Sequence, residues 1–323
     1  AAVLQIPEAE SCGFSCVLVV HSPVETEVAV VYDTVDGEKA YPLCKIPADP
    51  GCNEIQVYTL EGQESIGNIR YFKERYLEET PVFDAKIPSD EVIDIIIPIY
   101  NGLQYFDKLF AGIEKTKMKY RLILVDDQSP DPVVREYLER YVAEHEGTVL
   151  LRNEKNMGFL PSVNRALAIA EHHVALVNTD VEVPEGWLER LMWPIFTKEK
   201  VASSTPFTTC GTICSFPNFC EDNVIFEGMP LWQIDDAFRQ IRPQYATMPT
   251  GIGFCMGMNL EAIREVGLLD EENFDKGYGE ENDWCQRAIQ AGYTNVQVEN
   301  LFVYHKHGGS FSSEEKLRLL KSH

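Results

Sequence analysis

The sequence predicts an α/β protein in which a mostly parallel sheet, flanked by helices, follows a small β-rich domain. Two observations carry this prediction. Short β-rich runs fill the first part of the chain, whereas aliphatic runs alternate with amphipathic stretches after Asp90. With 323 residues, 45% of them hydrophobic, the chain is also long enough to bury two cores. We therefore expect an accessory domain over residues 1–90 and a larger domain over residues 91–323.

The predicted accessory domain lacks a helical period of any length. Its apolar runs are short and are separated by Pro, Gly, Asp and Asn, which is typical of strands joined by turns. These runs are "FSCVLVV", "EVAVVYDTV" and "EIQVYTL". The stretch "EETPVFDAKIPSDE" then carries two prolines and several charges, as a linker does. The pattern predicts a small antiparallel β domain that ends near Asp90.

The remainder of the chain alternates between predicted strands and predicted helices. In chain order the segments are "VIDIIIPIY", "FDKLFAGIEKT", "RLILV", "VVREYLERYVAEH", "TVLLRN", "PSVNRALAIAEHH", "VALVN" and "GWLERLMWPIF". Near-continuous aliphatic strands between amphipathic helices indicate a parallel sheet covered on both faces. Because right-handed crossovers place the carboxyl ends of such strands at one edge, we expect a ligand to bind at that edge.

Charge and cysteine content limit the partners and the compartment. Asp and Glu number 51 against 28 Lys and Arg, and the formal charge of −23 argues against nucleic acid or an anionic membrane face as the main partner. An acidic enzyme that takes anionic substrates would need a metal ion. Nine cysteines without paired CxxC blocks are typical of structural thiols in a reducing compartment.

The chain shows no signal for export or for a membrane span. Its start lacks a basic region followed by an apolar run, and no segment reaches the roughly 18 apolar residues of a span. We therefore expect a cytoplasmic protein. Peripheral contact with the inner face of the membrane stays open.

Polar clusters mark the ends of the predicted strands. Four clusters rich in carboxylate, amide or imidazole groups are "IPIYNG" (97–102), "VDDQSPD" (125–131), "VNTDVEV" (177–183) and "GEENDWCQRA" (279–288), and "YHKHGGS" (304–310) follows as a fifth. Neither GxGxxG nor GxxxxGK[ST] accompanies them, which disfavours a dinucleotide-binding fold and a P-loop NTPase. Any phosphate charge must therefore be bound in another way.

Two of these clusters could hold a metal ion. Asp180 together with an imidazole of "YHKHGGS" would make a mixed oxygen and nitrogen site suited to Mn²⁺ or Mg²⁺, which could neutralise a diphosphate leaving group. The alternative is a solvated turn aspartate and a surface histidine. The HxH pattern does not decide between them, because alternate residues of a strand often point the same way for structural reasons.

The cluster at 279–288 allows two interpretations as well. Glu280, Glu281 and Asp283 fall in the first turn of a predicted helix, where the helix dipole favours carboxylates, so plain capping explains them. In the alternative interpretation, one of them lies in a cleft with a pKa suited to accept a proton from a hydroxyl.

Taken in this order, the clusters make residues 92–310 resemble the family 2 glycosyltransferases, inverting enzymes with the GT-A fold. The N-terminal ninety residues lie outside the resemblance. The forms "NEKNMGF" and "VNTDVEV" are somewhat similar to rhamnosyltransferases, which favours a bacterial surface polysaccharide pathway. The matching segments are "VIDIIIPIYNG", "VDDQSPD", "NEKNMGFLPSVNRAL", "VNTDVEV", "GIGFCMGMNLEAIREVGLLDE", "GYGEENDWCQRAIQAGY" and "YHKHGGSF".

The resemblance implies a role for each candidate residue of the donor site. Asp127 would accept a hydrogen bond from the N3–H group of a pyrimidine base, since an imide N–H is a donor and a carboxylate an acceptor. Asn164 and Arg165 would border the base and the diphosphate. Asn178 replaces the first Asp of the family's DxD element and could still accept from a ribose hydroxyl. The remaining residues assigned to the nucleotide-sugar site are Pro98, Tyr100, Asn101 and Thr179.

The resemblance also implies metal ligands and a base. Asp180 matches the metal-binding Asp of DxD, His305 matches the family's histidine ligand, and His307 is the reserve. Because Asn178 removes a charge, the site would hold metal less tightly. Glu281 stands where the family has an Asp base, one methylene longer, so Glu280 stays an alternative; Asp283 belongs to the same catalytic cluster.

The implied function is inverting transfer of a hexose from a nucleoside-diphosphate sugar to a hydroxyl of a glycan or glycolipid, by metal-assisted single displacement. Bacterial polysaccharide or glycoconjugate synthesis is the expected setting. A catalytically weakened sugar- or nucleotide-binding module of the same fold is the alternative, and it would account for Asn178 and Glu281. A nucleotidylyltransferase is disfavoured because "IPIYNGLQYF" lacks a Gly- and Arg-rich loop. The sugar, base, acceptor, oligomeric state and role of the N-terminal domain stay open.

Overall fold

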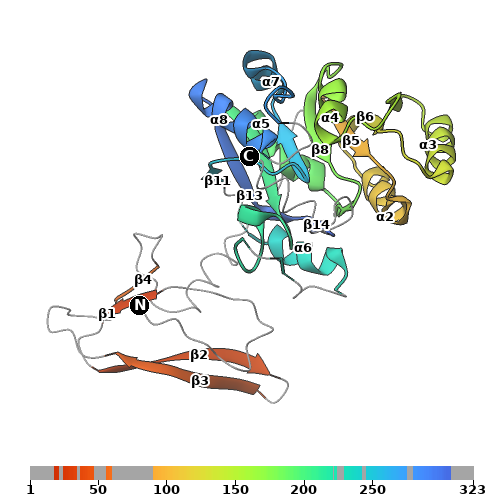
Figure 1. Cartoon of the computed structure of the whole chain (residues 1–323). Coiled ribbons are helices and arrows are strands. Elements are labelled where there is room, and N and C mark those ends of the chain that lie inside the picture. The colour runs from red at the N-terminus through yellow and green to blue at the C-terminus, as the bar shows by residue number, and fades with distance from the viewer. Residues whose placement is uncertain are drawn as a thin grey trace. The chain divides into compact units, whose positions relative to one another are not determined.

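The computed structural model divides the chain into two compact units, Ala1–Thr80 and Pro81–His323 (Figure 1). The residues that it describes are 18–21, 25–34, 37–46, 56–59, 90–220, 222–223, 229–241, 245–274 and 279–306. His307, the reserve metal ligand, lies outside them.

The described part of the first unit consists of two antiparallel strand pairs. β2 (Thr26–Thr34) pairs with β3 (Gly37–Ile46), and β1 (Leu18–His21) pairs with β4 (Gln56–Thr59). The β2–β3 pair is a hairpin, since Thr34 lies opposite Gly37 in its register. These strands agree with the β-rich fold that the sequence predicts for this part of the chain.

The second unit is built on one eight-stranded sheet with the order β11-β13-β10-β12-β8-β5-β6-β7. Figure 1 shows helices on both sides of this sheet. Its strands are β5 (Val92–Ile99), β6 (Lys119–Asp126), β7 (Val149–Arg152), β8 (His173–Val177), β10 (Val201–Phe207), β11 (Tyr245–Met248), β12 (Cys255–Met258) and β13 (Thr294–Phe302). The helices are α2 (Leu103–Glu114), α3 (Pro132–Glu144), α4 (Phe159–Leu167), α5 (Trp187–Thr197), the short 3₁₀ turn η2 (Thr212–Cys214), α6 (Leu231–Arg239), α7 (Leu260–Val266) and α8 (Glu280–Gln290).

Both faces of the sheet are covered by apolar side chains, as the near-continuous aliphatic strands predict. In β5 the isoleucines at 93, 95, 97 and 99 belong to a core with α2, α3 and α5, whereas Ile96 belongs to the core on the other face with α4, α7 and α8. This split follows from the alternation of side chains along a strand. The predicted α/β class with a flanked sheet is therefore confirmed.

The carboxyl ends of β5, β6 and β8 meet at one edge of the sheet. β5 is parallel to both neighbours, with Ile99 beside Asp126 and Ile96 beside Leu176. Pro98 is tolerated in β5 because the pairing with β8 ends before it. The clusters at 97–102, 125–131 and 177–183 thus lie together, as predicted. The cluster at 279–288 opens α8 instead of ending a strand.

β12 runs antiparallel to both β8 and β10, and β11 antiparallel to β13. Cys255, the first residue of β12, lies opposite Val177, the last residue of β8. Because β12 runs in the opposite direction to β8 and β10, it starts at the edge of the sheet where they end. The residues just before β12 therefore arrive at the same edge as the carboxyl ends of β5, β6 and β8.

A separate two-stranded pair brings a late segment to that edge. β14 (Tyr304–His305) is antiparallel to β9 (Val181–Glu182), with His305 opposite Val181. Lys306 N also donates to the carbonyl oxygen of Asp180, at 3.0 Å. This pairing carries the C-terminal histidine segment to the residues that follow β8.

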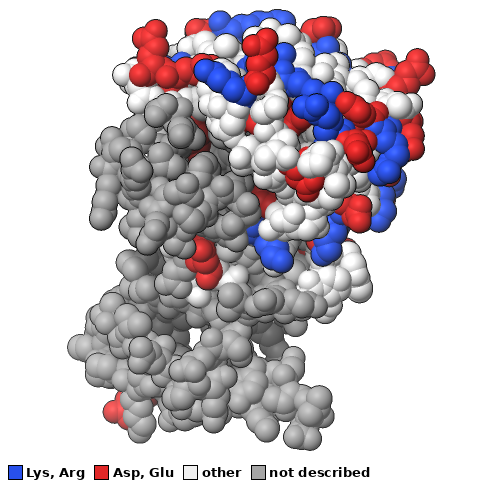
Figure 2. Space-filling model, turned by 45° about the vertical axis from the view of Figure 1, so that its right-hand side comes forward, with Lys and Arg blue, Asp and Glu red and all other residues white. Residues whose placement is uncertain are grey.

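Two features of the described residues concern possible binding partners: the length and hydrophobicity of the helices, and the charge of the surface. None of the described helices is both long and apolar enough to cross a membrane. On the face shown in Figure 2, acidic and basic side chains are interspersed over the described surface. That face has no large area of one charge sign to attract a polyanion.

Candidate functional site

The turn after β6 is held by hydrogen bonds of the Asp126, Ser129 and Asn101 side chains. Asp126 is buried, and its Oδ1 accepts from Ser129 N at 2.9 Å. Ser129 Oγ in turn accepts from Asn101 N, also at 2.9 Å, which ties the turn to the one after β5. The Asn101 Oδ1 atom accepts from Asp131 N at 3.4 Å. Asn101 and its half-exposed neighbour Tyr100 thus lie at the edge where β5, β6 and β8 end, which we call the ligand edge. The hydrogen bonds above hold their turn in place.

Asp127 holds the loop between β7 and α4. Its carboxylate is 4% exposed and accepts from Asn153 Nδ2 (2.7 Å), Met157 N (2.7 Å) and Gly158 N (2.8 Å). A carboxylate offers about four acceptor positions, so three are in use and one remains for a ligand. The structure therefore gives Asp127 a loop-binding role beside the predicted contact with a base.

For Asp127→Ala we expect weaker binding of free nucleoside diphosphate by calorimetry, together with a stability loss of about 1–3 kcal/mol, because three donors lose their acceptor. Asp131→Ala is the matched control, since Asp131 caps α3 from the same turn through Val133 N at 2.9 Å. Diphosphate affinity equal to wild type in Asp127→Ala would limit this carboxylate to the loop.

Asn164 and Arg165 of α4 hold other segments of the chain. Asn164 is buried, and its Nδ2 donates to Leu269 O (2.8 Å) and Glu271 Oε1 (2.7 Å), so both N–H groups are used. Its Oδ1 accepts from Leu269 N at 3.0 Å. Arg165 is exposed, and its Nη1 donates to the Asn153 side chain at 2.8 Å. Of this predicted pair, Arg165 is the better placed to contact a ligand.

The residues after β8 form the centre of the site. Asn178 N donates to Phe254 O at 2.8 Å, and Thr179 and Asp180 are buried. Gly102, at a φ of 82°, caps the start of α2 so closely that a Cβ atom there would lie 3.4 Å from Thr179 Oγ1. Glycine adopts this left-handed conformation without strain, so α2 can begin beside Thr179.

His305 lies against Asp180. The distance from His305 Nε2 to Asp180 Oδ1 is 3.3 Å, and His305 Nδ1 is 2.8 Å from Cys210 O. A carbonyl oxygen only accepts, so Nδ1 carries a proton and, in the neutral ring, Nε2 presents its lone pair toward Asp180. The ring of Phe254 stacks on the imidazole, with the centroids 5.1 Å apart. These contacts therefore fix the orientation of the His305 ring.

This arrangement fits a divalent cation. A histidine ligand usually donates its second N–H to a carbonyl or a carboxylate, as His305 does. Two ligands about 2.1 Å from one ion and at right angles are about 3 Å apart, close to the observed separation. Within the described ranges, no three or more His, Cys, Asp or Glu side chains are grouped so that they could hold a metal ion. Two side chains would then be the protein's share, as is common where substrate phosphates and water complete the shell.

Glu281 lies in the first turn of α8 with a buried carboxylate. Burial raises its pKa, opposed by backbone hydrogen bonds at Gly253 and Gly279 and by a hydrogen bond with Glu280. Its Oε2 atom is buried and has no hydrogen-bond partner within the described part of the chain. Asp283 differs, because Arg287 Nε donates to its Oδ2 at 2.7 Å in a half-exposed ion pair. Of the predicted carboxylates, Glu281 thus best fits a proton acceptor, and Asp283 fits a helix-stabilising role.

Gly253 and Phe254 contact both the Glu281 carboxylate and the histidine of the Asp180–His305 pair. The Gly253 backbone hydrogen-bonds to the Glu281 carboxylate, and a Cβ atom on Gly253 would lie 3.9 Å from Glu281 Oε1. Phe254 follows it and stacks on His305. The Glu281 carboxylate and the His305 ring therefore contact neighbouring residues of one dipeptide.

Comparison with known proteins identifies the family. Residues 94–267 match the model of glycosyl transferase family 2, which is more than half of the chain. The chain belongs to this family.

One curated relative of this family 2 glycosyltransferase is N-acetylgalactosaminyltransferase 7 of Drosophila melanogaster, 26% identical over 239 residues. That alignment covers 67% of this chain and 40% of the relative, so the chain spans less than half the length of the relative.

Two solved structures show the same fold. GalNAc-T7 with UDP, GalNAc and Mn²⁺ has a TM-score of 0.55 at 18% identity, covering 72% of this chain and 48% of its own. The mannosyltransferase PcManGT from Pyrobaculum calidifontis, in complex with GDP-Man and Mn²⁺, has a TM-score of 0.52 at 15% identity, covering 77% of this chain and 67% of its own. The GT-A fold that the resemblance implies is confirmed.

Three features of the site in this family 2 glycosyltransferase were not assigned from sequence. They are the stacking of the Phe254 ring on His305, the hydrogen bond from His305 Nδ1 to the Cys210 carbonyl, and the contact of the Gly253 backbone with Glu281. The only available signal was "GIGF", where two glycines precede an aromatic residue; the structure places this stretch just before β12. The carbonyl of Cys210 has no sequence signal, because every residue carries one.

Proposed function

We propose that this family 2 glycosyltransferase moves a sugar from a nucleoside-diphosphate sugar to an acceptor hydroxyl, with Mn²⁺ or Mg²⁺ bound by Asp180 and His305. The observation that carries the proposal is the placement of the His305 ring, with Nδ1 2.8 Å from Cys210 O and Nε2 3.3 Å from Asp180 Oδ1. The solved neighbours add support, since one was obtained with UDP and Mn²⁺ and the other with GDP-Man and Mn²⁺.

Different residues at the ligand edge would bind the cation, the base and the ribose of the donor. A bound cation would supply Lewis-acid stabilisation of the diphosphate as it leaves. Asp180 and His305 would hold that cation. Asp127, with Tyr100 and Asn101 on the neighbouring turn, would orient the base, and Asn178 would accept from the ribose. The buried setting strengthens each of these polar contacts relative to water.

Glu281 would accept the proton of the acceptor hydroxyl. Its Oε2 is buried without a hydrogen-bond partner among the described residues, so that oxygen can accept a hydroxyl proton without first losing another bond. The raised pKa makes the carboxylate a stronger base than a solvated glutamate. Glu280, its buried neighbour, is the alternative base.

The proposed reaction is a single displacement, which inverts the anomeric configuration. Proton NMR of the first product formed would show the coupling constant of the anomeric proton and so its configuration. A product with the configuration of the donor would contradict direct attack by the acceptor.

The pH dependence should follow the Glu281 carboxyl. Because burial raises its pKa above the ordinary value of about 4.3, the base becomes protonated at a higher pH than a solvated glutamate would. We expect kcat to fall as the pH drops through that raised pKa, with donor affinity falling less. In Glu281→Gln this acid limb should be absent, and a profile of unchanged shape would assign the limb to another group.

A transfer assay with added Mn²⁺ and with EDTA would test the proposal as a whole. We expect turnover that EDTA removes and Mn²⁺ restores. Donor binding without turnover would favour the sugar- or nucleotide-binding module instead. A thermal-shift screen of UDP, GDP and dTDP sugars with Mn²⁺ would identify the donor, because a ligand that binds only the folded state raises Tm.

The wider setting forms part of the same proposal. We assign catalysis to residues 91–323 and an accessory role to residues 1–90. The acceptor would be a glycan or glycolipid in bacterial polysaccharide or glycoconjugate synthesis, and the enzyme would work in the cytoplasm.

A further inference from the structure

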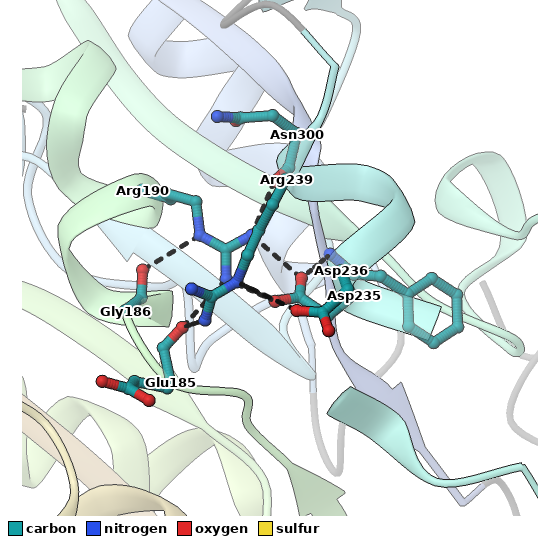
Figure 3. Close-up of polar contacts among 8 residues, drawn as sticks. Glu185, Gly186, Arg190, Asp235, Asp236, Arg239 and Asn300 are labelled. Carbon is teal, nitrogen blue, oxygen red and sulfur yellow. Dashed lines mark hydrogen bonds and ion pairs between the residues drawn. The ribbon is translucent and has the colours of Figure 1, made fainter. Parts of the chain in front are cut away.

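A cluster of two arginines and one aspartate lies between α5 and α6, with Arg190 and Asp235 buried and Arg239 at the surface. Arg190 of α5 donates to Asp235 of α6 in a fork, with Nη1–Oδ1 at 2.9 Å and Nη2–Oδ2 at 2.7 Å. Arg239 Nε adds a third bond to Asp235 Oδ2, also at 2.9 Å. Figure 3 shows the two guanidinium groups converging on this carboxylate. Because Arg190 is 3% exposed and Asp235 1%, water cannot replace these bonds.

One side of the cluster binds the end of β13. Arg190 Nη1 donates to Asn300 O at 2.7 Å, and Phe302 N donates to Asp235 Oδ1 at 3.2 Å. These backbone groups lie five and three residues before His305. The cluster therefore fixes the chain immediately before it delivers the histidine.

The other side of the cluster binds the segment that follows Asp180. Arg190 donates to Gly186 O at 3.0 Å and to Glu185 O at 3.1 Å, and Arg239 Nη2 also donates to Glu185 O. Glu185 lies five residues after Asp180. Arg190 thus bonds to both chain segments that carry the proposed metal ligands, and Arg239 adds a bond to the segment after Asp180.

Stability alone gives a weak reason for this cluster. Removing two charges from water is costly, and buried ion pairs are often no more stable than well-packed apolar residues of similar volume. The fork does provide directional bonds to four backbone groups that apolar residues could not make. Its geometry is thus better suited to setting positions than to adding stability.

We propose that Arg190, Asp235 and Arg239 are positioning residues that set the separation of Asp180 and His305, and thereby the affinity for the divalent cation. This inference rests on the proposed function. It adds that cation affinity is controlled from α5 and α6, by residues that touch neither the cation nor the sugar donor.

The chain offers a matched control for the test. Asp94, at the start of β5, is fully buried and is held by an Arg121 fork with Nε–Oδ1 at 2.7 Å and Nη2–Oδ2 at 2.8 Å. It lies at the amino end of β5, opposite the ligand edge. Asp94→Asn and Asp235→Asn therefore make the same chemical change at two buried aspartates that each accept an arginine fork, although Arg121 is 22% exposed and Arg190 only 3%.

The experiment measures Mn²⁺ binding to variants of the whole 323-residue chain by EPR of free Mn²⁺, with the Mn²⁺ concentration for half-maximal turnover as a second readout. For Asp235→Asn we expect Mn²⁺ affinity to fall about 10-fold or more, the range seen when groups behind metal ligands are changed. At saturating Mn²⁺, kcat should stay within about 3-fold. Asp94→Asn should keep the affinity of wild type, and an equal loss in both variants would overturn the proposal.

A second variant separates positioning from folding. Arg190→Met combined with Asp235→Leu removes both charges but keeps the volume apolar, so the fold is expected to survive. It also removes the bonds to Asn300 O and Phe302 N, so Mn²⁺ affinity should still fall. A folded double variant with the Mn²⁺ affinity of wild type would show that the cluster serves stability only, against the proposal.

Asp180→Ala and His305→Ala tell the two proposals apart. If both weaken Mn²⁺ binding and Asp235→Asn does not, the positioning role is wrong and the metal site stands. If neither weakens Mn²⁺ binding, the proposed metal site is wrong, and the positioning role falls with it.

Discussion

Asp180→Ala is expected to lower sugar transfer at least about 10³-fold while the protein remains folded. The carboxylate would be one of two protein ligands of the cation, which supplies several kcal/mol of leaving-group stabilisation, and each 1.4 kcal/mol is a factor of ten in rate. The backbone bond from Lys306 N to Asp180 O, at 3.0 Å, does not need the side chain, so the pairing of β9 with β14 should persist. Initial rates at saturating Mn²⁺, with Tm as the folding check, measure this effect.

Glu182→Ala is the matched control for Asp180→Ala. Glu182 lies two residues further along the same segment and pairs with Lys108 at 2.9 Å, on the surface. We expect its rates to match wild type. Turnover retained in Asp180→Ala, next to an unaffected control, would remove the main support for metal-assisted transfer by these residues.

Glu281→Gln is expected to lower kcat by roughly 10²- to 10⁴-fold, the usual contribution of a general base. Donor affinity, measured by calorimetry, should change little, because the residue is assigned to the acceptor hydroxyl. Glu280→Gln and Asp283→Asn are the comparisons. A larger loss in Glu280→Gln would move the base to Glu280, and a larger loss in Asp283→Asn would contradict the structural role of its ion pair with Arg287.

The same substitution should stabilise the protein at neutral pH. The folded-state pKa of Glu281 is raised, so proton binding favours the folded state at low pH, and this contribution is lost as the pH rises through the folded-state pKa. Glutamine has no charge to bury. The stability gain of Glu281→Gln over wild type should therefore be largest at neutral pH and should shrink toward pH 4, as denaturant titrations would show.

From the strand pattern alone, the site could be predicted only where neighbouring parallel strands supply it; His305 and Glu281 were assigned through the family resemblance. "IPIYNG", "VDDQSPD" and "VNTDVEV" each follow an aliphatic run, and parallel strands with right-handed crossovers end at one edge. Their convergence at β5, β6 and β8 follows from that pattern. The pattern did not predict the roles of single side chains. Most hydrogen bonds of the Asp127 and Asn164 side chains are made with backbone groups far away in sequence, at 157–158 and 269.

By itself, the sequence determined that the larger unit is a flanked α/β sheet with a polar edge rich in carboxylates, because periodicity and strand ends are local properties. Only the tertiary structure decided which groups meet at that edge. β12 runs against its neighbours and brings Gly253 and Phe254 to the site, and the pairing of β14 with β9 brings His305 to Asp180, 125 residues earlier in the chain. Strand direction and register between distant segments depend on packing across the whole sheet, so no local pattern contains them.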